Sequence, residues 1–145
     1  MAKTLATIGY EKATQADVIG RLKSAGVEVV IDVRAVPSSR RAGFSKTILA
    51  GSLHDAGIDY VHLRALGTPK PGRDAARKGH TAEMHAIYEK HLEEPKTQFE
   101  LAEAADIAKE RKAALLCYEA EAAGCHRRIV ADLIRDKTGL SIIDL

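Results

Sequence analysis

The chain has 145 residues, 46% of them hydrophobic and 29% charged, which suits one soluble globular domain and is too short for two ordinary ones. Its apolar runs fall short of the roughly 20 residues that cross a bilayer, and its first residues lack the layout of a signal peptide. Two cysteines do not make a disulfide scaffold, and a net charge of +2 does not by itself indicate nucleic-acid binding. We therefore expect a cytoplasmic protein with reduced thiols and no membrane partner.

The charges are distributed unevenly along the chain. The stretch Arg34–Lys46 contains four basic residues and no acidic one, and Arg64–Lys78 contains five basic residues against Asp74 alone. Most of the compensating acidic residues lie in Glu89–Glu121. Such clusters are either basic surfaces for an anionic ligand or ordinary solvated faces.

Strands and helices alternate from the N-terminus. We predict a strand over Thr4–Gly9 and a second over Val27–Val33, whose nearly continuous Val and Ile residues are typical of a strand buried on both faces. Between them Thr14 and Asp17 form a variant capping box. Apolar residues at helical spacing then predict a helix that stops near Gly26.

The middle of the chain combines loops with one helix and one strand. The loop Arg34–Lys46 leads into a helix that begins at about Ser45 or Lys46 and ends at Gly57. A third strand follows over Ile58–Leu63. A longer loop is expected over Arg64–Gly79, because this stretch is rich in proline and glycine.

The second half is expected to be mainly helical. Two helices are predicted at roughly Thr81–Glu93 and Pro95–Arg111, with the proline near the first position of its helix. A buried strand over Ala113–Cys117 follows, then a turn at Gly124 and a last amphipathic helix. The residues Ser141–Ile143 predict a final short strand.

This order predicts a single α/β domain over residues 1–145. We expect a three-layer sandwich with a mostly parallel sheet of four to five strands flanked by helices. Ligand sites in such sheets lie outside the carboxyl ends of the strands. Small or polar residues occur at each predicted strand end, namely Gly9-Tyr10, Asp32-Val33-Arg34, Tyr60-Val61-His62 and Cys117-Tyr118-Glu119.

Several short motifs, in this order, resemble the family called domain of unknown function 488. They are Thr7-Ile8-Gly9-Tyr10, Asp32-Val33-Arg34, Pro37-Ser38-Ser39-Arg40, Gly43-Phe44-Ser45-Lys46, Tyr60-Val61-His62-Leu63, Cys117-Tyr118-Glu119 and Cys125-His126-Arg127. The resemblance covers nearly the whole chain and implies a compact α/β domain without implying an activity. A weaker similarity is to rhodaneses, which also have an Asp-x-Arg after an early strand and a cysteine that opens an anion-binding loop.

The two cysteines suggest thiol chemistry. Cys125 is a candidate nucleophile, because a helix N-terminus with His126 and Arg127 beside it favours the thiolate; the alternative is a packed, inert residue. Cys117 is expected to be a small buried hydrophobic residue, although the two sulfurs could also form a reversible disulfide. A weaker alternative is a metal site formed by Cys117, Cys125 and His126. No resident cofactor is predicted.

Two carboxylates at neighbouring strand ends are candidates for acid–base catalysis. Asp32 and Glu119 could act as general acid and base, an arrangement suited to glycosidic bonds including those of nucleosides. Alternatively, each carboxylate pairs with a neighbouring arginine or caps a turn. Tyr10 could stack on a base or sugar, and His62 could carry a proton. Their structural alternatives are a strand-end aromatic and a hydrogen-bonded core histidine.

Basic and hydroxyl side chains at the same edge predict a phosphate site, because arginine binds phosphate bidentately. The alternative is that Arg34 and Arg127 pair with the acidic residues. Our leading expectation is a small enzyme for a phosphorylated, nucleotide-like or nucleic-acid substrate; thiol-dependent chemistry and a non-catalytic nucleic-acid-binding module are the other two. The predicted phosphate ligands are Arg34, Ser39, Arg40, Lys46 and Arg127.

Overall fold

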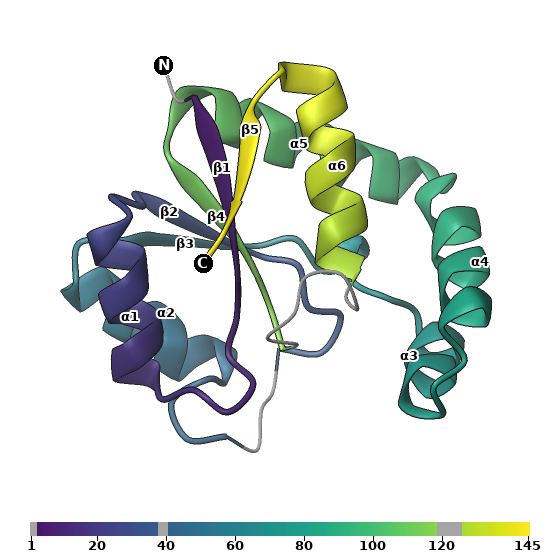
Figure 1. The fold of residues 1–145 in the computed structure, drawn as a ribbon, viewed down its shortest axis with the longest axis horizontal. Coiled ribbons are helices and arrows are strands. Elements are labelled where there is room, and N and C mark those ends of the chain that lie inside the picture. Colours follow the sequence, from purple (N-terminus) through teal and green to yellow (C-terminus); the bar gives the residue numbers. More distant parts are fainter. Residues whose placement is uncertain (1–2, 38–40, 119–125) are drawn as a thin grey trace.

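The computed structural model describes residues 3–37, 41–118 and 126–145 (Figure 1). In them, five strands form one sheet: β1 (Thr4–Gly9), β2 (Val29–Asp32), β3 (Asp59–His62), β4 (Ala113–Cys117) and β5 (Ser141–Asp144). Their order is β3-β2-β4-β1-β5, and every neighbouring pair is parallel. The predicted α/β fold is confirmed, with all five strands parallel.

The helices lie on both faces of this sheet (Figure 1). They are α1 (Gln15–Ser24), α2 (Lys46–Asp55), the 3₁₀ helix η1 (Arg64–Leu66), α3 (Lys70–Arg77), α4 (Thr81–Leu92), α5 (Pro95–Glu110) and α6 (His126–Thr138). One face is covered by α1 and α2. The other is covered by α5 and α6, with α3 and α4 beyond them. Within the described ranges, the helices are too short or too polar to cross a membrane.

Side chains of the central strands alternate between two hydrophobic cores, because successive residues of a strand point to opposite faces. Val30 and Leu116 pack in the core beneath α1 and α2. Ile31 and Leu115 pack in the core beneath α5 and α6. The central strands β2 and β4 are therefore buried on both faces, as the run of Val and Ile residues predicted.

The predicted limits of the first helix are confirmed by its two ends. The Thr14 side chain accepts a hydrogen bond from the backbone N–H of Asp17 at 3.1 Å, which caps the helix N-terminus. At the other end Gly26 has a φ of +73°, a conformation that glycine adopts without strain. Local capping signals therefore set both ends of α1.

The predicted loop over Arg64–Gly79 is wrong, because this stretch contains η1 and α3. Pro71 lies in the first turn of α3, where a residue without an N–H costs little. Gly72 is buried, and a Cβ there would lie 2.6 Å from Thr68 Cγ2, so this glycine allows close packing. Proline and glycine here begin and pack a helix, although the same residues usually indicate a loop.

Candidate functional site

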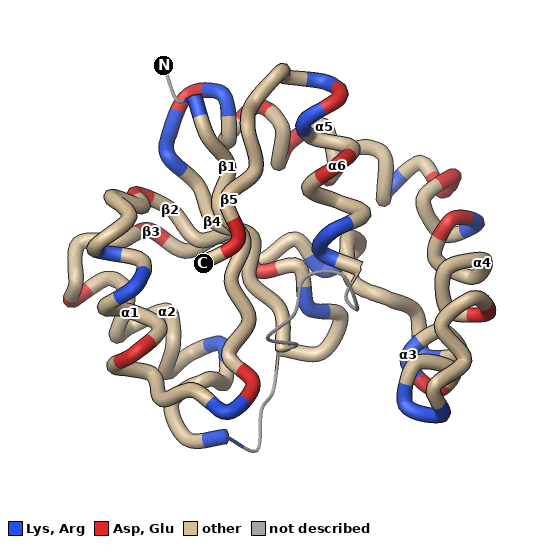
Figure 2. The backbone as a smooth tube through the Cα atoms, viewed as in Figure 1, with Lys and Arg blue, Asp and Glu red and all other residues tan. Residues whose placement is uncertain are grey.

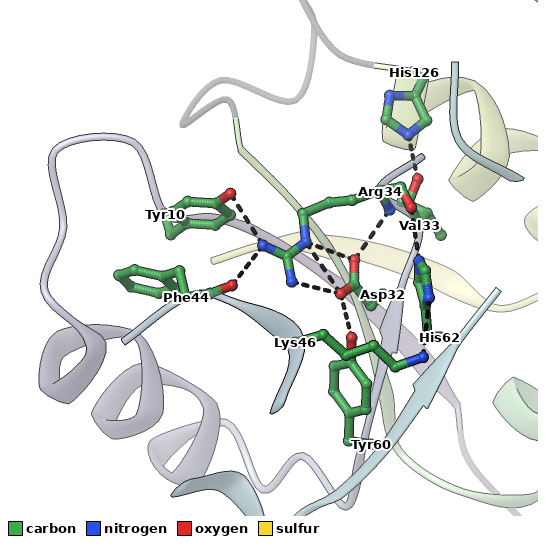
Figure 3. Close-up of polar contacts among 9 residues, drawn as sticks. All are labelled: Tyr10, Asp32, Val33, Arg34, Phe44, Lys46, Tyr60, His62 and His126. Atoms are coloured by element: carbon green, nitrogen blue, oxygen red, sulfur yellow. Dashed lines mark hydrogen bonds and ion pairs between the residues drawn. The ribbon is translucent and has the colours of Figure 1, made fainter. Parts of the chain in front are cut away.

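A buried ion pair lies at the carboxyl end of β2 (Figure 3). Asp32 is 0% exposed and Arg34 is 6% exposed. The Nε and Nη2 atoms of Arg34 donate to the two Asp32 oxygens at 2.9 and 2.7 Å, and the Arg34 backbone N–H donates to Oδ1 at 3.0 Å. The short Asp-Val-Arg sequence at a strand end thus folds back on itself as a bidentate pair.

Three other segments complete the surroundings of this pair. Arg34 Nη1 donates to the Tyr10 hydroxyl at 3.1 Å and to the Phe44 carbonyl at 2.7 Å. The Tyr60 hydroxyl donates to Asp32 Oδ2 at 2.5 Å. The rings of Tyr10 and Phe44 stack, with centroids 4.3 Å apart. These contacts join β2 to the ends of β1 and β3 and to the loop before α2, and they favour a pairing role for Asp32 and Arg34.

The protonation states of these groups follow from their surroundings. Burial opposes the charge of Arg34, but hydrogen bonds and the charge of Asp32 outweigh it and raise the pKa of Arg34 above its ordinary value. Burial and the Asp32 charge both raise the pKa of Tyr60. At neutral pH, Arg34 is therefore charged and the Tyr60 hydroxyl keeps its proton.

Lys46 and His62 lie beside this pair (Figure 3), and both are more exposed than Asp32 and Arg34. His62 Nε2 is 2.8 Å from the Arg34 carbonyl, and since a carbonyl only accepts, Nε2 carries the hydrogen. The other ring nitrogen, Nδ1, lies 3.5 Å from the Lys46 Nζ, and in the neutral imidazole it is the nitrogen that carries the lone pair. Lys46 is exposed and is the first residue of α2. A cation and a proton-accepting nitrogen therefore adjoin each other at a helix N-terminus.

His126 is held at the start of α6. Its Nε2 donates to the Val33 carbonyl at 2.7 Å, and its ring meets the Tyr88 ring edge-on at 5.5 Å. Burial lowers the pKa of His126 to about 4, and the charge of Arg127 also lowers it. The hydrogen bond to Val33 and the charge of Asp32 act in the opposite direction. His126 is therefore neutral at neutral pH and joins α6 to β2.

Cys117 is buried at the end of β4, as predicted, but it is disulfide-bonded, which differs from the expected reduced thiol. The other cysteine of the chain, Cys125, lies outside the described residues. The Nη1 atom of Arg127, a fully buried residue, lies 2.9 Å from Cys117 Sγ. The predicted phosphate ligand Arg127 thus contacts sulfur inside the protein.

The structure brings together part of the predicted site. The residues gathered around the end of β2 are Tyr10, Asp32, Arg34, Lys46 and His62. The predicted site residues outside the described part of the chain are Ser39, Arg40, Glu119 and Cys125. Among the residues that are described, no three His, Cys, Asp or Glu side chains are grouped so that they could hold a metal ion.

Two members of this cluster, Tyr60 and Phe44, stand in the motifs quoted above but were not among the predicted site residues. Tyr60 precedes His62 by two positions in β3, so both side chains point to the same face, and this alternation could have identified it. Phe44 contributes through its backbone carbonyl, for which its residue type gives no signal.

Comparison with known proteins shows the family of the chain. No curated protein matches the chain. The family model described as "Domain of unknown function DUF488" matches residues 14–134, which include β2, β3 and β4 and the pair Asp32 and Arg34. Since this match covers most of the 145 residues, the chain belongs to the DUF488 family.

Proposed function

We propose that this protein is a small enzyme that binds a phosphate-bearing substrate, nucleotide-like or nucleic acid, at the carboxyl edge of the sheet. The observation that carries the proposal is the pair of Lys46 and His62, a cation and a proton-accepting imidazole 3.5 Å apart. They adjoin the N-terminus of α2, where backbone N–H groups and the helix dipole favour an anion.

Each residue has a distinct role in this proposal. Lys46 binds a phosphate oxygen through its ammonium group. His62 is kept in one tautomer by the Arg34 carbonyl, so Nδ1 takes up or returns a proton at the substrate. The Asp32–Arg34 pair holds the ends of β1, β2 and β3 in place beneath the ligand. Arg34 therefore supports the site from inside.

The substitution Lys46→Gln is expected to weaken phosphate binding about tenfold, because a hydrogen bond to a charged group contributes roughly 1.5–3 kcal/mol. Adenosine monophosphate and inorganic phosphate are the probes, and NMR amide shifts give the affinities. The control is Lys23→Gln, which removes an exposed lysine from the last turn of α1, at the opposite edge of the sheet. Equal affinities for the two variants, or no shifts near residues 46 and 62 in the unmodified protein, would refute the proposed site.

A second candidate function is thiol–disulfide exchange, which the disulfide at Cys117 and the neighbouring guanidinium of Arg127 favour. A reducing dithiol would break the protein S–S bond and become a disulfide itself. The dithiol would give up two electrons and two protons, and both protein sulfurs would become thiols. The Arg127 charge, 2.9 Å from Sγ, would then stabilise a Cys117 thiolate.

If this second function is correct, Arg127→Met should shift the equilibrium with glutathione about tenfold towards the disulfide, or roughly 30 mV, because the reduced form loses its stabilising charge. Mass spectrometry after an acid quench measures the two forms. Arg128→Met is the control, since Arg128 is exposed and pairs with Asp132 and Asp144. A reduction potential of the unmodified protein below about −300 mV would contradict the function and indicate a structural disulfide.

A further inference from the structure

The helix α3 presents a basic surface that the proposed site does not use. Lys70, Arg77 and Lys78 are exposed on α3 and at its end. Arg73, also on α3, donates to the Thr68 carbonyl at 2.8 Å. Asp74 is the only acidic residue of this stretch, and it pairs with Arg77 in an exposed contact. Residues 70–78 still carry four basic side chains against this one carboxylate, a net charge of +3.

This basic helix is fixed to the end of β2 by the segment that precedes it. Gly67 lies so close to Ala35 that a Cβ on the glycine would be 2.2 Å from the Ala35 backbone nitrogen. The Tyr88 hydroxyl donates to the Leu66 carbonyl at 2.5 Å. Because Ala35 follows Arg34 directly, the segment that leads into α3 passes next to the residues that support the proposed phosphate site.

The basic residues of α3 and the Lys46 site lie on opposite sides of the sheet. Leu66 and Ala75 pack in the core beneath α5 and α6, whereas α2 covers the other face. Figure 2 shows the basic segments of α3 and of the start of α2 at the same end of the molecule, on either side of the strand ends. A chain of phosphates that passes the strand ends would meet both basic regions in succession.

We propose that α3 binds the phosphate backbone of a polynucleotide whose reacting unit lies at Lys46 and His62. This inference rests on the proposed function and names its substrate class. A helix of eight residues is about 12 Å long, so its cations can meet several successive phosphates. A membrane surface fits less well, because the large hydrophobic side chains exposed in the described residues all lie outside α3.

The test uses the triple variant Lys70→Gln, Arg77→Gln, Lys78→Gln in the full chain, leaving Arg73 because it bonds Thr68. The matched control replaces Lys23, Lys109 and Lys137 with Gln. These exposed lysines lie in the last turns of α1, α5 and α6, at the amino edge of the sheet. Fluorescence anisotropy follows binding to single-stranded DNA and RNA of about 20 nucleotides, between about 50 and 200 mM salt.

The α3 variant should bind the oligonucleotides about tenfold more weakly at the lower salt. Its logarithmic salt slope should fall by about 2, since each phosphate contact contributes about 0.7. The control variant should retain the original slope, and both variants should bind adenosine monophosphate like the unmodified protein.

Three results would overturn this inference. They are equal oligonucleotide binding by the α3 and control variants, no oligonucleotide binding by a protein that still binds adenosine monophosphate, and α3-dependent binding only to phosphatidylserine vesicles. The second result leaves the proposed function intact. Conversely, α3-dependent oligonucleotide binding without any binding of adenosine monophosphate would support the α3 surface and overturn the site at Lys46.

Discussion

The substitution Asp32→Asn is expected to lower the free energy of unfolding by about 3–5 kcal/mol, because it leaves the buried charge of Arg34 without its carboxylate. The loss also affects the Tyr60 hydroxyl and the Arg34 backbone N–H, both of which donate to Asp32. Urea unfolding at neutral pH measures the effect.

The matched control for this change is Asp59→Asn. Asp59 pairs with Arg111 at 2.8 Å, but the two side chains are 61% and 40% exposed, so the expected loss is below about 1 kcal/mol. The double variant Asp32→Leu, Arg34→Met should recover much of the lost stability, because it removes both buried charges together. Similar losses for Asp32→Asn and Asp59→Asn would show that the Asp32 carboxylate is hydrated in solution.

The stability of these variants also distinguishes two roles for Asp32 and Arg34 in the site. The residue types and their spacing are equally compatible with a catalytic acid beside a phosphate-binding arginine and with an internal ion pair. The distinction depends on the hydrogen bonds that surround the pair. Arg34 donates to the Tyr10 hydroxyl and the Phe44 carbonyl, and Asp32 accepts from the Tyr60 hydroxyl. These partners come from distant parts of the chain, so Asp-Val-Arg alone does not reveal them.

Fold features with a local cause were predictable from the sequence. The cap at Thr14, the stop at Gly26 and the buried β2 each follow from a few consecutive residues. The helix α3 was not predictable in this way, because its prolines and glycines are typical of loops. Its formation depends on packing of Gly72 against Thr68 and Ile87 and on the position of Pro71 in its first turn.

Lys46 and His62 show which features of the candidate site could be predicted from the sequence and which could not. Both were among the predicted residues, and the parallel register that places His62 beside Asp32 brings β3 to the same edge. Their proximity was not predicted, because it depends on how α2 packs over that edge. The order of elements in the sequence therefore predicted which residues lie at the carboxyl edge of the sheet. Which of these residues contact one another is known only from the structure.

The second large effect is expected when the pH is lowered, which should reduce the free energy of unfolding. His126 has a pKa of about 4 in the folded protein and an ordinary value of 6.5 when unfolded. Between these values the unfolded chain binds more protons, so the free energy of unfolding falls as the pH falls from 6.5 to 4. The contribution is complete above pH 6.5 and amounts to about 3 kcal/mol. It arises because a protonated ring would be a charge largely removed from water and placed beside Arg127.

The variant His126→Gln should lose this pH dependence, since an amide can donate to the Val33 carbonyl but does not titrate. The unmodified protein should be the more stable of the two at neutral pH, and the difference should narrow by about 3 kcal/mol as the pH approaches 4. Urea unfolding at several pH values measures the difference, in which the carboxylates common to both proteins cancel. His80→Gln is the control, because His80 is 57% exposed. If the difference stays constant across this pH range, the pKa of His126 in the folded protein is not lowered. The ring would then gain a proton in the folded protein as readily as in the unfolded chain.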